Sequence, residues 1–254
     1  VSIIIANRNQ ASVIWKCIDE LSRHTDYPNY ELIIVDQISD IEDMDFVYQE
    51  IKDELGDRLN LLSYSEANYS AAINFGVSHA KGDFVVVLAN SAIPVNDNWL
   101  FTMCSQAKRA GIGVVGARII DADNELVHAG GILGIADDVH GLFLGHSFDD
   151  AGYMGRAQLR QEYMFVSSAC FMVSVEDYAL VGGLDEGDLA NTKYCVVDFC
   201  LKLKQQGLKT LWEPQVVFRQ NMDLASDCNS LGIKYKAETD TLLMKRWSAA
   251  CQND

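Results

Sequence analysis

Polar residues stand directly after two strand-like apolar runs near the start of the sequence. Asn7 and Arg8 follow the run Val1–Ala6, and Asp36 follows the run Glu31–Val35. A carboxylate in such a place can accept hydrogen bonds from a ribose or a nucleobase edge, and an arginine can face a diphosphate through paired hydrogen bonds. We interpret these residues as candidates for a nucleotide site. Asp36 taken alone is equally well explained as a helix cap or turn residue.

The runs that carry these residues alternate with segments of helical periodicity. This alternation predicts an α/β fold with a Rossmann-like, mostly parallel sheet and helices on both faces. Ligands of such sheets bind beyond the carboxyl ends of the strands, where the polar residues stand. The later part of the chain predicts further elements: strands at Val114–Ile120, Phe165–Val175, Thr210–Trp212 and Val216–Phe218, and helices at Val197–Gln206 and Ala237–Ala250.

Domain organisation follows from length and from the lack of a linker. The chain has 254 residues, which a single α/β domain can accommodate. We expect one domain with a nucleotide-binding half at 1–100, an acceptor half at 101–225 and a C-terminal helical tail at 226–254. The sequence begins without Met inside a strand-like run, so we expect a piece excised from a longer polypeptide whose other domains are partners.

Composition excludes several classes of partner. The formal net charge is −16 and no basic run is present, which argues against nucleic acid. No apolar run approaches the roughly 20 residues that span a bilayer, so we expect no transmembrane segment. The seven cysteines include no CxxC pair, which is typical of a reducing compartment. We expect a cytoplasmic location, with the inner face of the membrane as the alternative.

Several segments, taken in order, resemble the signatures of the family 2 glycosyltransferases of the GT-A fold. The similarity extends from residue 1 to about residue 225. A Rossmann dehydrogenase is the competing interpretation, but no G-x-G-x-x-G follows the first run. The segments that carry the resemblance are Val1–Asn9, Glu31–Asp36, Asn68–Gly76, Ala80–Asp83, Val115–Arg118, His128–Gly131, Gly182–Glu186 and Asp198–Leu201.

The resemblance implies transfer of a sugar from a nucleoside diphosphate donor to a glycan acceptor, in polysaccharide biosynthesis of a bacterial type. Such chemistry needs a countercharge for the leaving diphosphate and a base for the acceptor hydroxyl. In this family a divalent Mn or Mg ion supplies the countercharge, held by an Asp-x-Asp-like motif and a later His. The nucleotide-binding positions of this sequence are Asn7, Arg8, Asp36, Asn68 and Asn74.

The sequence departs from the family at each catalytic position. Ala89, Asn90 and Ser91 stand where the metal-binding acids are expected, and Gln220 stands at the place of the later His. Neutral side chains are poor ligands for hard cations, so we expect no metal cofactor. Val196 occupies the position of the base, and valine cannot accept a proton.

Asp198 and Arg219 are charged residues close to these positions. Asp198 lies two residues after Val196, but an acid favoured by the helix N-terminus explains it better than catalysis. Arg219 or Arg8 could neutralise the diphosphate in place of a metal. Two hypotheses therefore stand: a transferase that works without metal, and a catalytically inactive pseudo-glycosyltransferase that acts as a binding or scaffolding module.

Overall fold

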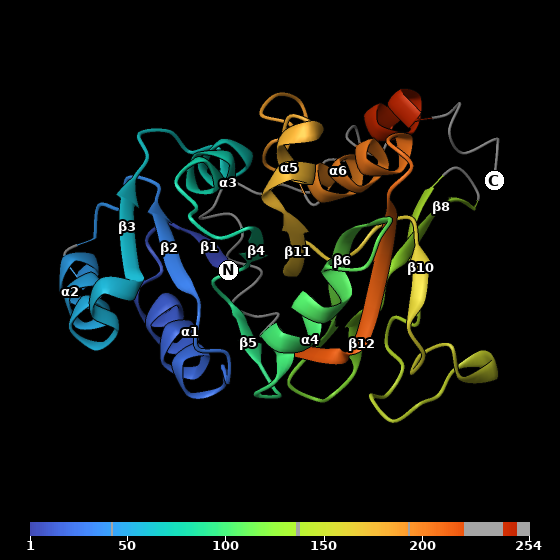
Figure 1. Cartoon of the computed structure of the whole chain (residues 1–254), viewed down its shortest axis with the longest axis horizontal. Coiled ribbons are helices and arrows are strands. Elements are labelled where there is room, and N and C mark those ends of the chain that lie inside the picture. Colours follow the sequence, from blue (N-terminus) through green and yellow to red (C-terminus); the bar gives the residue numbers. More distant parts are fainter. Residues whose placement is uncertain (42, 136–137, 193, 221–240, 248–254) are drawn as a thin grey trace.

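The computed structural model describes residues 1–41, 43–135, 138–192, 194–220 and 241–247. One sheet runs through both halves of the chain, in the order β10-β12-β6-β11-β4-β1-β2-β3, with β5 paired to β12 and β7 to β6 (Figure 1). The strands are β1 (Ser2–Asn7), β2 (Glu31–Asp36), β3 (Leu59–Ser63), β4 (Phe84–Leu88), β5 (Ala92–Pro94), β6 (Ile112–Ile120), β7 (Leu126–His128), β8 (Gly131–Ile135), β9 (Asp138–Gly141), β10 (Gln161–Tyr163), β11 (Cys170–Ser174) and β12 (Lys209–Gln220).

The first half of the sheet is parallel. β1 pairs in parallel with both β2 and β4, and β2 pairs in parallel with β3. Their interior residues are apolar and mostly β-branched, which suits strands covered on both faces. This register places Asn7 beside Asp36, so the residues that end β1 and β2 meet at one edge of the sheet.

The second half of the sheet mixes directions. β11 is antiparallel to both β4 and β6, while β12 is parallel to β6 and antiparallel to β10. β8 and β9 form a separate antiparallel hairpin. Because β11 runs against β4, its N-terminal end lies beside the carboxyl end of β4, and residues that precede β11 border the edge where β1 and β2 end.

Helices cover both faces of the sheet, which confirms the predicted architecture. α1, α2 and α4 pack one apolar core on one face, and α3, α5, α6 and the helical residues 241–247 pack a second core on the other (Figure 1). The helices are α1 (Ala11–Arg23), α2 (Asp43–Leu55), α3 (Tyr69–Ser78), α4 (Trp99–Ala107), α5 (Val175–Leu180) and α6 (Tyr194–Gln205), with 3-10 turns η1 (Gly56–Arg58) and η2 (Tyr153–Gly155).

Two strand predictions were wrong. The predicted strand Phe165–Val175 is regular only over Cys170–Ser174, because the preceding residues form a loop that crosses toward β8. The predicted pair Thr210–Trp212 and Val216–Phe218 is one strand, β12, whose register against β6 shifts between Glu213 and Val217. That shift admits Pro214, which has no N–H to give to a ladder.

Candidate functional site

A chain of hydrogen bonds links the carboxyl ends of β4, β1 and β2. Asn90 Nδ2 donates to Asn7 Oδ1 at 2.8 Å, and Asn7 Nδ2 donates to the hydroxyl of Tyr48 at 2.9 Å. Tyr48 in turn donates to Asp36 Oδ1 at 2.6 Å. The structure therefore brings together three residues that the sequence singled out. The sequence did not indicate Tyr48, whose place on the buried face of α2 looks like an ordinary core position.

The Asp36 carboxylate accepts hydrogen bonds from Tyr48 and Ser39. Its Oδ1 also accepts from the Ser39 hydroxyl at 2.5 Å, and its Oδ2 accepts from the Ser39 backbone N–H at 3.0 Å. Burial raises the pKa of Tyr48, and the hydrogen bond to Asp36 raises it further, so Tyr48 stays a donor. Each carboxylate oxygen can accept about two hydrogen bonds. Asp36 Oδ2 thus keeps capacity for a ligand donor.

The loops that follow β1 and β2 are fastened to each other. Asn9 Nδ2 donates to Asp40 Oδ1 at 2.6 Å, and the Asp40 N–H donates back to Asn9 Oδ1 at 2.8 Å. The Asn9 N–H also donates to the Ser39 hydroxyl at 2.9 Å. The half-buried Arg8 lies on the first of these loops, and within the described ranges no ion pair engages its guanidinium. Arg8 follows Asn7, the residue paired with Asp36, so its backbone lies at this edge of the sheet.

Gln37 and Ile38, in the loop after β2, adopt arrangements that we expect to lower the free energy of unfolding. Gln37 is 0% exposed, and neither its Nε2 nor its Oε1 has a hydrogen-bond partner among the described residues. Ile38, which follows, has a φ of 49°, a region that β-branched residues rarely occupy. Strained and unsatisfied groups gather at binding sites. Sequence reasoning missed both residues, since neither type carries a signal of its own.

The positions expected to hold a metal contain neutral side chains that bond to each other. Gln220 lies opposite Ala92 in the pairing of β12 with β5, and its Nε2 donates to the Ser91 hydroxyl at 3.2 Å. Asn90 Nδ2 donates both of its hydrogen bonds inside the protein, to Asn7 Oδ1 and to Gln10 Oε1, the latter at 2.5 Å. Ala89 contributes only its backbone, whose N–H donates to Ala169. These residues do not fit a hard divalent cation, which prefers charged oxygen ligands.

Arg219 points away from this group. Its Nε donates to the backbone oxygen of Asp121 at 3.3 Å, and its Nη2 donates to Asn124 Oδ1 at 2.7 Å. Successive side chains of a strand project to opposite faces, so Arg219 and Gln220 face different sides of β12. Arg219 holds the turn after β6, and this engagement argues against Arg219 as the countercharge.

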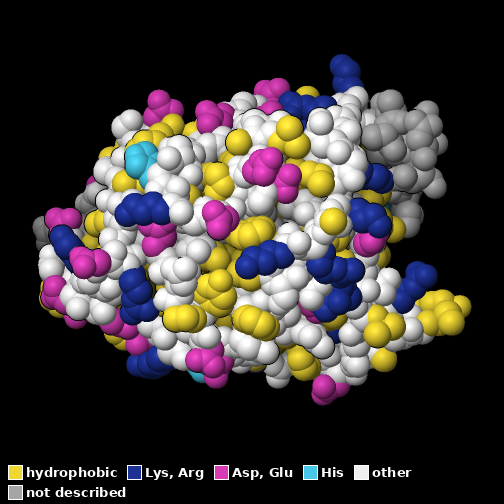
Figure 2. Space-filling view, in the orientation of Figure 1, with side chains coloured by type: hydrophobic (Ala, Val, Ile, Leu, Met, Phe, Trp, Pro, Cys, Tyr) yellow, Lys and Arg dark blue, Asp and Glu magenta, His cyan; other side chains and the backbone are white. Residues whose placement is uncertain are grey.

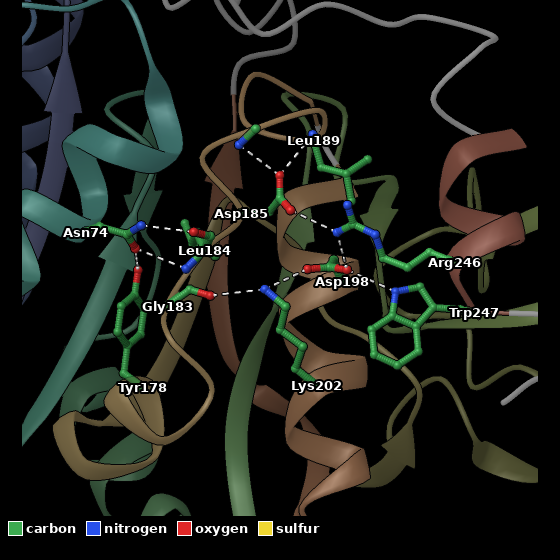
Figure 3. A network of polar contacts seen from close by, with 11 residues as sticks. Asn74, Tyr178, Gly183, Leu184, Asp185, Leu189, Asp198, Lys202, Arg246 and Trp247 are labelled. Carbon is green, nitrogen blue, oxygen red and sulfur yellow. Dashed lines mark hydrogen bonds and ion pairs between the residues drawn. The ribbon is translucent and has the colours of Figure 1, made fainter.

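The position of the base is closed to solvent. Val196 lies on α6 and is fully buried in the second core. Asp198, two residues further, is also 0% exposed and forms an ion pair with Lys202 Nζ at 2.9 Å. Its Oδ1 accepts hydrogen bonds at 3.0 Å from Arg246 and from the Trp247 indole (Figure 3). Asp198 therefore fastens the C-terminal helical residues to α6.

The same network reaches the loop after α5. Arg246 Nη1 also donates to Asp185 Oδ2 at 2.9 Å, and Asp185 Oδ1 accepts from the N–H groups of Gly187 and Leu189 (Figure 3). Burial alone would raise the pKa of Asp185, but these hydrogen bonds, led by Arg246, lower it below its usual value. The carboxylates of Asp185 and Asp198 therefore connect α6, the loop after α5 and residues 241–247.

Asn68 and Asn74 bind α3 to that loop. Asn68 caps α3 by accepting from the Ala71 N–H at 3.0 Å and donates to the backbone oxygen of Glu186. Asn74 donates to the Leu184 backbone oxygen at 2.9 Å and to Glu186 Oε1 at 2.8 Å, and it accepts from the Tyr178 hydroxyl and the Leu184 N–H. The Asn74 amide is therefore fully used inside the protein, and a nucleotide contact by either residue remains a prediction.

A cavity of about 360 Å³ lies in the second half of the chain. It lies between β7, β9, the loop before β11 and the start of α6, and its wall includes Ser167 and Ser168. The next residue, Ala169, accepts the hydrogen bond of Ala89 at 2.9 Å, so the cavity begins one residue from the contact of β11 with the residues that follow β4.

Glycines shape one wall of this cavity. A Cβ on Gly131 would lie 1.9 Å from the ring of Phe165, so only glycine lets that ring rest on the backbone of β8. The ring of His128 meets Phe165 edge-on, with centroids 5.7 Å apart, and His128 Nδ1 accepts from the Gly130 N–H at 3.1 Å. The His128–Gly131 segment therefore builds an aromatic wall. No group of three or more His, Cys, Asp or Glu suited to a metal occurs in the described part of the chain.

Sequence comparison assigns the chain to a family. The glycosyl transferase family 2 profile matches residues 2–180, and the chain belongs to this family. It is 34% identical over 218 residues to the uncharacterized protein y4gI of Sinorhizobium fredii, covering 84% of this chain and 23% of y4gI. It is 27% identical over 224 residues to the O-antigen biosynthesis protein RfbC of Myxococcus xanthus, covering 85% of this chain and 17% of RfbC. The chain thus spans less than a quarter of these relatives.

Solved structures share the fold. The mannosyltransferase PcManGT from Pyrobaculum calidifontis, in complex with GDP-Man and Mn²⁺, superposes with a TM-score of 0.63 at 16% identity, over 86% of this chain and 56% of that one. GalNAc-T7 with UDP, GalNAc and Mn²⁺ superposes with a TM-score of 0.70 at 16% identity, over 87% of this chain and 43% of that one. The fold is that of the GT-A glycosyltransferases.

Acidic and basic side chains are interspersed over the face seen in Figure 2. No described helix has the length and apolar character needed to cross a membrane.

Proposed function

We propose that this chain binds a nucleoside diphosphate sugar at the edge formed by β1, β2 and β4, without a divalent metal. The observation that carries the proposal is the neutral hydrogen bond between Gln220 and Ser91, at 3.2 Å, where the family holds its ion. In this proposal Asp36 Oδ2, which accepts one hydrogen bond from the Ser39 N–H, accepts a second from the nucleotide, and Arg8 binds the diphosphate. An arginine and a diphosphate can form two charge-assisted hydrogen bonds.

Metal-assisted transfer with a carboxylate base is not part of this proposal. Val196 is buried and apolar, and the nearby Asp198 carboxylate is engaged by Lys202, Arg246 and Trp247. A base must lie within hydrogen-bond reach of the acceptor hydroxyl. We therefore favour a domain that binds the donor and a glycan as a binding or scaffolding module.

A transferase that works without metal is the second candidate. It is favoured by Arg8, whose position next to the nucleotide edge would let it stabilise the charge of a departing diphosphate. Measurement of sugar transfer and donor hydrolysis by the full-length protein separates the two candidates.

Titration calorimetry with UDP, GDP and dTDP, in the presence of EDTA, tests nucleotide binding. We expect binding of at least one nucleotide, and a loss of about tenfold in affinity in Asp36→Ala, since one hydrogen bond to a charged group contributes about 1.5 kcal/mol. Asp53→Ala is the matched control, because Asp53 is exposed on α2 and contacts only Gln49 among described side chains. Equal affinities of the two variants would contradict the placement of the nucleotide at Asp36.

A further inference from the structure

The cavity beside the degenerate metal position has an unusual lining for a site next to a diphosphate. None of its described lining residues is Asp, Glu, Lys or Arg. Just over half of the lining residues are wholly apolar: Val127, Val139, Leu144, Phe165, Val166 and Val197. The others are Gly141 and the polar residues His128, Ser167, Ser168 and Tyr194. Transfer of an isolated charge into such surroundings is strongly unfavourable. The diphosphate must therefore lie outside this cavity, toward Arg8 and Asp36.

The polar groups of the cavity suit a neutral ligand with hydroxyl groups. Ser168 and Ser167 lie on the same wall, and a serine hydroxyl both donates and accepts hydrogen bonds. His128 and Tyr194 also line the cavity, and His128 Nδ1 already accepts from the Gly130 N–H. A few polar groups set into an apolar wall are typical of small-molecule sites, and about 360 Å³ lies at the small end of their range.

We propose that this cavity binds a neutral hexose that carries a methyl group, either as a 6-deoxy carbon or within an acetamido group, and that this hexose is the acceptor sugar. The inference rests on the proposed function, because it places the hexose beside the donor site. The aliphatic wall accommodates the methyl group, and the serine hydroxyls bind the sugar hydroxyl groups. Ser167 does so as a donor, because its Oγ already accepts from the Ala169 N–H at 3.1 Å. The lining comes from β7, β9, α6 and the loop before β11, apart from the strands that hold Asn7 and Asp36.

The test is an NMR titration of the chain with matched methyl glycosides of rhamnose, N-acetylglucosamine, mannose and glucuronic acid. We expect rhamnoside or N-acetylglucosaminide to bind at least about fourfold more tightly than mannoside, which corresponds to burial of about one methyl group. The glucuronide should bind at least tenfold more weakly than the preferred glycoside, because its carboxylate loses solvation. Equal affinities across the set, or preference for the glucuronide, would overturn the proposal.

Two variants locate the binding. Val127→Thr replaces a methyl group of the lining by a hydroxyl and should reduce the preference for the methyl-bearing sugar, whereas Val95→Thr, at a position outside the cavity, should not. Leu144→Ser provides a second change in the lining, at a side chain that is 55% exposed. An unchanged preference in both cavity variants would place the sugar elsewhere.

The same titration separates this inference from the proposed function. If the chain binds a nucleoside diphosphate but no methyl glycoside, the inference fails and the proposed function stands. If it binds the glycoside but no nucleotide, the proposed function fails and the cavity assignment stands. Displacement of the glycoside by a nucleoside diphosphate sugar, but not by the nucleoside diphosphate, would assign the cavity to the donor and overturn the acceptor role.

Discussion

The unsatisfied amide of Gln37 is the clearest sign at the residue scale that the edge after β2 is not optimised for stability. A buried polar group without a partner costs about 1–3 kcal/mol. Gln37→Met keeps the shape of the side chain and removes both polar atoms. We expect the free energy of unfolding, measured by urea denaturation, to increase by about 1 kcal/mol.

Gln49→Met on the exposed face of α2 is the control for this change, and it should stay within about 0.5 kcal/mol of the wild type. A fall in stability for Gln37→Met would mean that the Gln37 amide already has a partner, such as an internal water. A rise in stability together with weaker nucleotide binding would show that the amide serves the ligand.

Substitution of Asp198 distinguishes a structural role of its carboxylate from a catalytic one. Asp198 is fully buried and bound to Lys202, Arg246 and Trp247. Its removal deprives the Trp247 indole of its acceptor and takes the buried carboxylate away from Lys202 and Arg246, which keep only Gly183 and Asp185 as acceptors. We expect Asp198→Ala to lower the free energy of unfolding by about 3 kcal/mol, the low end for breaking a buried ion pair. Asp188→Ala, in the exposed part of the preceding loop, should have little effect. A stable Asp198→Ala protein that had lost only activity would return Asp198 to the list of catalytic candidates.

At the scale of elements, the hydrogen bond from Arg246 to Asp185 helps to hold residues 241–247 to the rest of the domain, and we expect its contribution to depend on pH. The pKa of Asp185 is lowered in the folded state, against the effect of burial, chiefly through the hydrogen bond from Arg246. A lowered folded-state pKa stabilises the fold above the ordinary pKa of about 3.9, and this contribution disappears as the pH falls through the folded value.

The corresponding prediction compares urea unfolding at pH 6 and pH 3. The wild type should lose more stability than Asp185→Asn over this interval, because the variant has no carboxyl group at residue 185 to protonate. Asp188→Asn should behave like the wild type, since Asp188 is exposed. Identical losses in Asp185→Asn and wild type would show that Arg246 does not depend on this carboxylate.

Elements of the first half could be predicted from sequence because their signals are local. The β-branched runs before Asn7 and Asp36 define β1 and β2, and their alternation with helices fixes parallel pairing. The site was harder to predict from the sequence, because its contacts join residues that are far apart in the chain. Ser91 and Gln220 are 129 positions apart, and Asp198 and Arg246 are 48 positions apart. Local patterns carry no information on such pairs. The sequence predicted two strands in place of β12 for a similar reason. Pro214 resembles the end of a strand unless the pairing with β6 is known.

At the scale of the whole molecule, the two halves of one sheet contribute different chemistry to a common edge. The parallel half provides the amide, tyrosine and carboxylate chain from Asn90 to Asp36. The mixed half provides a cavity whose described lining is uncharged and the strand that ends in Gln220. A charged donor and a neutral acceptor sugar can meet at the boundary, near Ala89 and Ser91, with no ion between them.

The most direct test of this account is the effect of Mn²⁺ on nucleotide affinity, measured by calorimetry in the wild type, in Ser91→Asp, in Gln220→His and in the double variant. The account predicts no appreciable effect in the wild type or in either single variant. In the double variant, whose two new ligands would share the space of the present 3.2 Å hydrogen bond, Mn²⁺ should tighten binding at least tenfold, about 1.4 kcal/mol. Tenfold tighter binding on adding Mn²⁺ to the wild type would contradict the central claim.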